Sequence, residues 1–527
     1  MGNNIDPCDL TKNQLGENNT TGLSRWSIFL PALSSFYSTY VGKQRFDQYV
    51  DPTRIPTKFE NGIEGMNWLN EKEGYFTYKW SLYSAGHANL DVNKFDPRED
   101  MIRNRDRSKT FILADSGGFQ IGKGVWEGDW KNPSCPKSQK KREQVLSWMD
   151  AYMDYGMILD IPVWVCDSDE GRKASGVNSF DEAVEATYIN NDYFMKNRTG
   201  ACKFLNVLQG GNHSEANDWY QRMKKYCDPA QYEQPFNGWA MGGQNKCSPT
   251  LALKRLVTLR EDKLLEKGQH DLMHFLGTSK LEWALFLTDI QNAVRKHHNE
   301  NFTVSFDCAS PFLATANGQM YSANEYVDRK KWVYRMGASV DNKKYATDNR
   351  KLADVLVNDK IFKRFEDSPI SDRLLISDVC KYAAGDLNKI GKEGKTSWDS
   401  FSYALQMGHN VHRHIAAVQE ANRLYENKTS CPKMLVDERH DKLYASDLIN
   451  EIFASDTGVA LALIEKHDSF LTGIIGTSGN TGKREANSLT HYKSMFVESK
   501  HSVEIHHIDD SGLDDTLLEQ MNDNATD

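Results

Sequence analysis

The chain has 527 residues and a net charge of −9, so it is not a protein coated in basic surface. Its 39% of hydrophobic residues allow a sizeable core and exclude a chain that is disordered throughout. The nine cysteines form no C-x-x-C pair, and the polar N-terminus lacks the apolar segment of a signal peptide. We therefore expect a cytoplasmic protein with reduced thiols and no membrane partner.

Three segments of the chain differ in character. Residues 1–25 are polar, and we expect a flexible N-terminal segment. Residues 26–425 alternate short apolar runs with longer amphipathic stretches, as a single barrel domain would. Residues 426–527 are predicted to form a C-terminal extension that ends in an acidic tail.

The apolar runs of the central segment predict strands, and the stretches between them predict helices. The expected strands are residues 111–115, 157–165, 204–209, 238–243, 273–278 and 303–308. Apolar residues at helical spacing predict helices over 141–156 and 281–298. Strand followed by helix, repeated, favours parallel βαβ units.

Each expected strand carries polar residues or glycines near its C-terminal end. In chain order these are Asp115, Asp160, Gln209, Gly242-Gly243, Gly277-Thr278 and Asp307. They follow one another at intervals of 30 to 49 residues, which suit one βα unit each. This pattern predicts an α/β fold, a (β/α)8 TIM barrel with insertions and a C-terminal extension. An open doubly wound sheet would gather such groups at one switch point instead.

The three strand-end acids suit chemistry at the anomeric carbon of a sugar. One carboxylate can attack C1′ and form a covalent glycosyl-enzyme, while a second moves protons. A third can accept N1–H and N2–H from the amidine-like edge of a purine. Gln209 and the amides of Gly242 and Gly243 would complete base recognition, and Phe119 would stack on the base. In LADSGGFQ (113–120) the paired glycines would let the backbone approach a flat ligand.

Simpler interpretations exist for each of these residues. An Asp after a strand is often a helix N-cap, a lone Gln is often a loop hydrogen-bonder and a lone Phe is often core. These interpretations would have to hold at every strand end at once. Three basic stretches, 103–109, 140–142 and 328–335, could form a local basic track or simply solvated faces.

Several motifs together resemble one known family. DSGGFQ (115–120), VLQGG (207–211), WAMGG (239–243), FLGTS (275–279) and FDCASPFLATANGQMY (306–321) occur in that order. They resemble the order in the queuine/archaeosine tRNA-guanine transglycosylases, TIM-barrel enzymes that exchange guanine for a 7-deazaguanine. LDIP (159–162) resembles the substrate-binding acid motif of the archaeal members, and MGHNVHRHIAAVQE (407–420) resembles a late histidine-bearing helix. The resemblance covers roughly residues 80–420.

The resemblance implies a role for each matching position. Asp307 matches the nucleophile and Asp115 the general acid/base. Asp160, Gln209 and the Gly243 amide match the groups that read the base, with Gly242 beside them. Phe119 and Leu276 match the two faces of the base slot, and Ser116 lies in the same substrate-binding motif.

The chain departs from the family in two places. The family carries two arginines after its FDC that touch the tRNA backbone, whereas residues 309–316 contain none. The family also binds zinc through three cysteines and a histidine, and only Cys380 and His409 match that set. We therefore expect no metal and no other cofactor, with Cys380 and His409 as packing residues.

Both departures resemble the divergent branch of bacteriophages and bacterial genomic islands, which inserts 7-deazaguanines into DNA and so evades restriction. The leading hypothesis is a pentosyltransferase that replaces guanine in DNA with a preQ0-type base, in the host cytoplasm if phage-encoded. Its partners would be DNA, the free base and, as in many tRNA enzymes, a second copy in a homodimer. The alternatives are a tRNA-guanine transglycosylase, a non-catalytic nucleic-acid-binding homologue and a retaining glycoside hydrolase.

Overall fold

The computed structural model describes most of the central segment and part of each flank. The described residues are 24–43, 62–94, 96, 99–316, 318–326, 332–338, 343–352, 368–380, 400–427, 430–439, 442–475 and 492–494. The predicted flexible segment therefore lies outside them up to residue 23, and so does the acidic tail.

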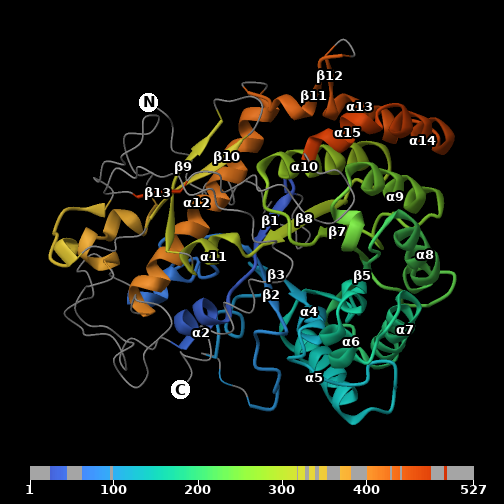
Figure 1. The fold of residues 1–527 in the computed structure, drawn as a ribbon, viewed down its shortest axis with the longest axis horizontal. Helices are drawn as coiled ribbons and strands as arrows, with labels where there is room; N and C mark the ends of the chain where they lie inside the picture. Colours follow the sequence, from blue (N-terminus) through green and yellow to red (C-terminus); the bar gives the residue numbers. More distant parts are fainter. Residues whose placement is uncertain are drawn as a thin grey trace.

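Eight parallel strands form the centre of the molecule (Figure 1). They are β1 (Ile28–Pro31), β2 (Trp80–Ser84), β3 (Phe111–Asp115), β4 (Tyr155–Met157), β5 (Lys203–Leu208), β6 (Gly238–Met241), β7 (Leu272–Phe275) and β8 (Thr303–Cys308). Each strand pairs with its sequence neighbour, and β8 pairs with β1. A parallel bridge between Ala32 and Leu82 joins β1 to β2, so the sheet closes on itself.

Helices surround this barrel and follow its strands in sequence. Those of the barrel region are α2 (Ser35–Lys43), α4 (Gly118–Gly122), α5 (Pro136–Tyr152), α6 (Asp169–Ser175), α7 (Phe180–Asn197), α8 (His213–Met223), α9 (Pro249–Glu261), α10 (Leu281–His297) and α11 (Ser310–Ala316). The predicted (β/α)8 TIM-barrel fold is confirmed.

Local sequence explains where several of these helices begin. Ser179, Asn212 and Ser248 each accept a hydrogen bond from the backbone three residues on, as N-cap side chains do. Proline occupies the first position of α5 and of α9, where its missing N–H costs no helical hydrogen bond.

Some predicted element bounds are wrong. The strand expected over residues 157–165 is β4, which ends at Met157, and a 3-10 helix occupies Val163–Asp167. The chain leaves the sheet there because Asp160 N–H turns back to the Ile158 carbonyl, and Pro162, which has no N–H, precedes the 3-10 helix. The helix expected over 141–156 starts earlier and ends at Tyr152, since Tyr155 begins β4. The prediction also lacked β1 and β2.

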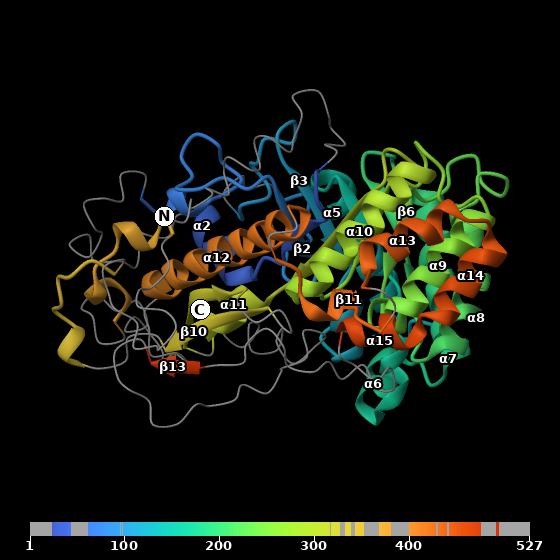
Figure 2. The same ribbon diagram turned by 90° about the horizontal axis from the view of Figure 1, so that it is seen from above.

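The chain beyond β8 adds elements to the barrel. The hairpin of β9 (Gln319–Glu325) and β10 (Val333–Ala338) precedes the long helix α12 (Ser400–Glu426), which contacts α11 and β9. The remaining elements are β11 (Val436–Asp437), β12 (Leu443–Tyr444), α13 (Ala445–Ala454), α14 (Thr457–Lys466), α15 (Asp468–Ile475) and β13 (Tyr492–Ser494). Figure 2 shows α13, α14 and α15 lying against α9 and α10. Residues 445–475 therefore cover the outside of the barrel, and the domain boundary at residue 425 stays a prediction.

Candidate active site

Asp307 lies on β8 at the carboxyl end of the barrel. Its Oδ1 accepts hydrogen bonds from the Gly277 N–H (2.8 Å) and from His274 Nε2 (3.0 Å). Among the described residues no donor contacts Oδ2. The side chain is 13% exposed. The carboxylate is thus fixed by one oxygen while the other is available to a substrate.

His274 is a functional candidate that the sequence analysis missed. It lies on β7 opposite Ser305, and its Nδ1 is 2.9 Å from the Ser305 hydroxyl. A neutral imidazole that donates from Nε2 must accept at Nδ1, and the Ser305 hydroxyl can donate there. Ser305 and Asp307 point to one face of β8 because strand side chains alternate. The strand register that aligns His274 with them is not visible in the motif MHFLGT.

Asp115 ends β3 on the same rim of the barrel. Its partner in the neighbouring strand register is Ser84, whose hydroxyl donates to Asp115 Oδ2 at 2.7 Å. Asp115 also raises the pKa of Asp160 by charge repulsion, which places these two carboxyl groups within electrostatic reach.

Asp160 and Gln209 form a buried pair beside Asp115. Gln209 Nε2 donates to Asp160 Oδ2 at 2.7 Å, and both residues are buried. Burial is the main cause that raises the pKa of Asp160 to about 7. Asp160 N–H bonds the Ile158 carbonyl and Ile161 N–H bonds Thr187, so the backbone on both sides of the carboxyl is fixed. A base whose edge donates two N–H groups would find a positioned acceptor here.

The glycines of DSGGFQ accommodate protein neighbours, which corrects the expectation that they admit a ligand. Gly117 has a φ of +84°, and a Cβ there would lie 2.5 Å from the Trp126 ring. A Cβ on Gly118 would lie 2.8 Å from the Asp160 carbonyl oxygen. Gly118 therefore lets the start of α4 approach the Asp160 segment closely, whereas Gly117 makes room for Trp126.

The second glycine pair follows β6. The Gly242 N–H donates to the Leu208 carbonyl, so this amide is already hydrogen-bonded within the protein and cannot donate to a base. A Cβ on Gly242 would lie 2.9 Å from Gln209 Nε2. Gly243 has a φ of +50° and packs against Gly210. Gly242 thus makes room for the Gln209 side chain, and the Gly243 amide stays the predicted contact to the base.

Phe119 and Leu276 are both partly exposed at the rim, where a base could reach them. Phe119 has an aromatic neighbour, Trp164, at a ring-centroid distance of 5.6 Å. Lys123 Nζ lies 5.5 Å from the Phe119 centroid and 5.9 Å from that of Trp164. Trp164 is a stacking candidate that sequence reasoning missed, because it lies in the run that was predicted to be a buried strand.

Two further residues of DSGGFQ are buried. Ser116 is 1% exposed. Gln120 is fully buried, and neither atom of its amide head has a hydrogen-bond partner among the described residues. A buried unpaired amide is costly, so Gln120 is a third candidate that the sequence analysis missed, in this case for contact with a ligand. The sequence contained it within the quoted motif but gave no reason to separate it from its neighbours.

Two of the three arginines in the basic stretch 103–109, Arg103 and Arg105, are buried, whereas Arg107 and Lys109 are exposed. Arg103 donates to the carbonyls of Lys94 and Asn89, and Arg105 bonds Thr110, the Tyr152 carbonyl and Asp154. In the second stretch Arg142 is buried and bonds Asn190. Neither stretch offers a row of exposed arginines, and residues 327–331 of the third lie outside the described residues.

Both ring nitrogens of His409 lie within hydrogen-bond distance of protein groups. Its Nδ1 lies 2.8 Å from the Ser368 hydroxyl and its Nε2 lies 2.8 Å from the Tyr321 carbonyl. Burial lowers the pKa of His409 to about 4. Cys380 is buried as well. The described residues contain no group of three or more His, Cys, Asp or Glu arranged to hold a metal ion, and the absence of zinc stays a prediction.

Comparison with known proteins assigns this chain to no family. No protein-family model and no curated protein matches this chain. Among solved structures, the chain resembles the endo-beta1,6-glucanase BT3312 at 11% identity and a TM-score of 0.30. That match covers 53% of this chain and 65% of the glucanase chain, and it carries no argument about activity. None of the helices in the described ranges has the length and apolar character needed to cross a bilayer.

Proposed function

We propose that the barrel rim is the active site of a base-exchange transglycosylase that replaces guanine in DNA with a 7-deazaguanine of the preQ0 type. The observation that carries the proposal is that Asp115 and Asp307 lie at the carboxyl ends of β3 and β8, with Asp160 just beyond the end of β4. These acids belong to the motifs DSGGFQ, LDIP and FDC, whose order along the chain resembles that of the guanine-exchanging family.

The geometry of Asp307 supports its role as the nucleophile. Oδ2 attacks C1′ of the flipped nucleotide, the C1′–N9 bond breaks, and the leaving guanine takes a proton from Asp115. The incoming base then gives a proton back to Asp115 and displaces Asp307 from C1′. Two displacements at C1′ retain the β configuration. Oδ1 keeps its two donors throughout, so the carboxylate need not reorient.

The Asp160–Gln209 pair supports recognition of the base. When ionised, Asp160 accepts the N1–H and N2–H of guanine or of a 7-deazaguanine, and Gln209 holds the carboxylate in place. Phe119 and Trp164 provide aromatic faces at the rim for stacking.

The helix after Asp307 favours DNA over the usual tRNA substrate. Residues 310–315 of α11 are buried and contain no cation. Asn410 Nδ2 fixes this helix by donating to the Pro311 carbonyl, the Thr315 hydroxyl and the Gln319 carbonyl. In the family that it resembles, arginines of this segment touch the tRNA backbone. A buried apolar helix cannot make those contacts.

The direct test is base exchange into a polymer. The full chain is incubated with labelled guanine or preQ0 and with either duplex DNA or bulk tRNA, and the label retained in each polymer is counted. We expect label in DNA, and no label with Asp307→Asn, which also yields no covalent adduct on a denaturing gel. Label in tRNA alone would replace the DNA assignment with the tRNA alternative. No label in either polymer, or a full-strength adduct with Asp307→Asn, would overturn the proposed mechanism.

Base affinity tests Asp160 separately. Because its pKa is about 7, the carboxylate form is lost as the pH falls through 7, so guanine should bind more weakly at about pH 6 than at about pH 8. Asp160→Asn should weaken binding roughly tenfold or more and remove this pH dependence. The measurement is equilibrium dialysis with labelled guanine. Asp169→Asn, at an exposed acid of α6, is the matched control.

A further inference from the structure

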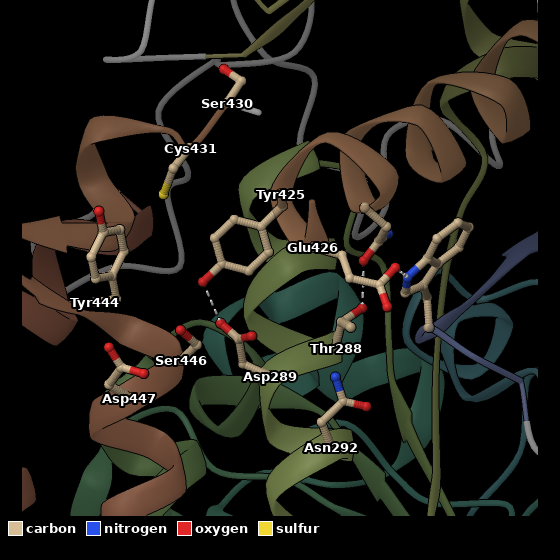
Figure 3. A pocket seen from close by; sticks show the side chains of 12 residues that line it. Thr288, Asp289, Asn292, Tyr425, Glu426, Ser430, Cys431, Tyr444, Ser446 and Asp447 are labelled. Atoms are coloured by element: carbon tan, nitrogen blue, oxygen red, sulfur yellow. Dashed lines mark hydrogen bonds between the residues drawn. The ribbon is translucent and has the colours of Figure 1, made fainter. Parts of the chain in front are cut away.

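A cavity of about 250 Å³ lies outside the barrel, between α10, the end of α12 and the start of α13 (Figure 3). Trp26, which lines it, precedes β1 and so lies toward the amino ends of the strands. The rim with Asp307 lies at the opposite ends. This cavity is therefore separate from the proposed active site, and nothing in the proposed base exchange uses it.

Asp289 of α10 presents a carboxyl group to this cavity. It is 8% exposed, and its Oδ2 accepts a hydrogen bond from the Tyr425 hydroxyl at 2.8 Å. Among the described residues no donor contacts its Oδ1. This oxygen is not fully buried, so it is accessible to accept a hydrogen bond from a ligand in the cavity.

The lining is acidic and has no basic side chain among its described members. Asp447 of α13 faces Asp289 closely enough to raise its pKa by charge repulsion. Glu426 does not add free charge, because Arg25 and the Trp26 indole N–H occupy its two oxygens. An entering cation would thus meet two carboxyl groups and no competing cation.

Aromatic side chains complete the lining. Trp26, Tyr425 and Tyr444 all border the cavity, and Tyr444 is 37% exposed. The negative face of an aromatic ring attracts ammonium and guanidinium groups, and acid beside aromatic is the combination that such groups prefer. A volume of about 250 Å³ lies below the range of drug-sized sites, so the ligand is small.

We infer that this cavity binds a small organic cation, with its primary ammonium or guanidinium group on Asp289 and its body among the aromatic rings. The inference does not rest on the proposed base exchange. The same chemistry could come from a free amine or from a lysine or arginine side chain.

Binding of a cation should expel a proton from the site. Burial raises the pKa of Asp289 to about 8, so this carboxyl is protonated at neutral pH and must ionise to hold an ammonium group. The other titratable or charged groups that line the cavity are Asp447, Tyr425, Tyr444, Cys431 and Glu426, the last paired with Arg25.

The test is titration calorimetry of the full chain with butylamine, and with 1-butanol as the neutral analogue. We expect butylamine to bind, butanol to bind far more weakly, and about one proton per amine to be released near pH 7 in buffers of different ionisation enthalpy. Affinity should rise with pH by up to tenfold per unit until about pH 8. Equal binding of the two probes, or no binding of the amine at millimolar concentration, would overturn the inference.

Two substitutions locate the site. Asp289→Asn and Asp447→Asn should each weaken butylamine binding, the former by roughly tenfold to a hundredfold, whereas Glu451→Gln at an exposed position of α13 should not. Unchanged affinity in Asp289→Asn would place the amine elsewhere and contradict the assignment. N-acetyl-lysine methylamide distinguishes the sources: tighter binding than butylamine identifies a protein side chain, and weaker binding identifies a free amine. Base exchange should be unaffected by either variant.

Discussion

His274 holds the carboxylate of Asp307 from the neighbouring strand. His274 Nε2 and the Gly277 N–H both donate to Asp307 Oδ1. These two donors at the end of β7 therefore fix the orientation of the carboxylate and the position of its other oxygen, Oδ2. Hydrogen bonds to a charged group are worth about 1.5–3 kcal/mol, which is enough to influence a reaction rate. His274 is thus a positioning residue of the proposed reaction.

We predict that His274→Leu slows formation of the covalent adduct by about tenfold to a hundredfold while guanine affinity stays unchanged. His274→Gln, whose amide can still donate to Asp307, should restore part of that rate. Quenched-flow measurement of the adduct and dialysis of guanine give the two readouts. If Leu and Gln slow the reaction equally, the histidine is only a packing residue.

At the scale of elements, a buried ion pair connects the loop before β3 to the chain that follows α5. Arg105 has a side chain that is 1% exposed and an ion pair with Asp154 at 2.7 Å. Burial lowers the pKa of Arg105 and raises that of Asp154, so desolvation offsets part of their attraction. Because Arg105 also bonds the Tyr152 carbonyl, it ties the β3 loop to the end of α5.

Removal of this arginine should therefore reduce stability without touching polymer binding. We predict that Arg105→Ala lowers the free energy of unfolding by about 3–5 kcal/mol, since it leaves buried acceptors unpaired. The slope of DNA affinity against salt should stay the same. Urea denaturation and salt-dependent binding measure the two quantities, with the exposed Lys140→Ala as control. A reduced salt slope in Arg105→Ala would mean that the stretch contacts phosphate after all.

For the whole molecule, buried carboxyl groups set the pH dependence of stability. Burial raises the pKa of Asp100 to about 6, of Asp160 to about 7 and of Asp289 to about 8. A group with a raised folded-state pKa favours the folded state below its unfolded pKa of about 4, and this advantage is lost as pH rises to the folded value. Buried histidines such as His409 act in the opposite sense, but only below about pH 6.5.

Asp160 and Cys135, whose pKa values are both about 7, also titrate near the window from about pH 7 to 8, so the difference between wild type and Asp289→Asn isolates Asp289 there. Ionisation of Asp289 should lower the free energy of unfolding there by up to about 1.4 kcal/mol per pH unit, and Asp289→Asn should remove this contribution from the curve. Urea unfolding at intervals between about pH 6.5 and 9 measures this, with Glu451→Gln as the charge-matched control. Parallel curves for wild type and Asp289→Asn would show that this carboxyl is ionised throughout.

The fold was predictable because its signal is repeated along the chain. Apolar runs that each end in a polar residue recur at intervals typical of one βα unit, and that period alone indicates a barrel. β1 and β2 escaped prediction because no acid, amide or glycine pair stands at their ends, and the contact of Ser84 at the end of β2 with Asp115 is visible only in the structure. β4 was misplaced because LDIP is apolar like a strand, although Asp160 turns the backbone out of the sheet before Pro162.

The candidate site likewise has a part that was predictable from the sequence and a part that was not. Asp115, Asp160, Gln209 and Asp307 could be proposed as site residues from the sequence, because strand ends and motifs are local in the chain. It took the folded structure to show that His274 contacts Asp307, that the DSGGFQ glycines pack on protein, and that Arg103 and Arg105 are buried. Those contacts depend on strand register and on burial between elements far apart in sequence, and no spacing along one strand encodes them.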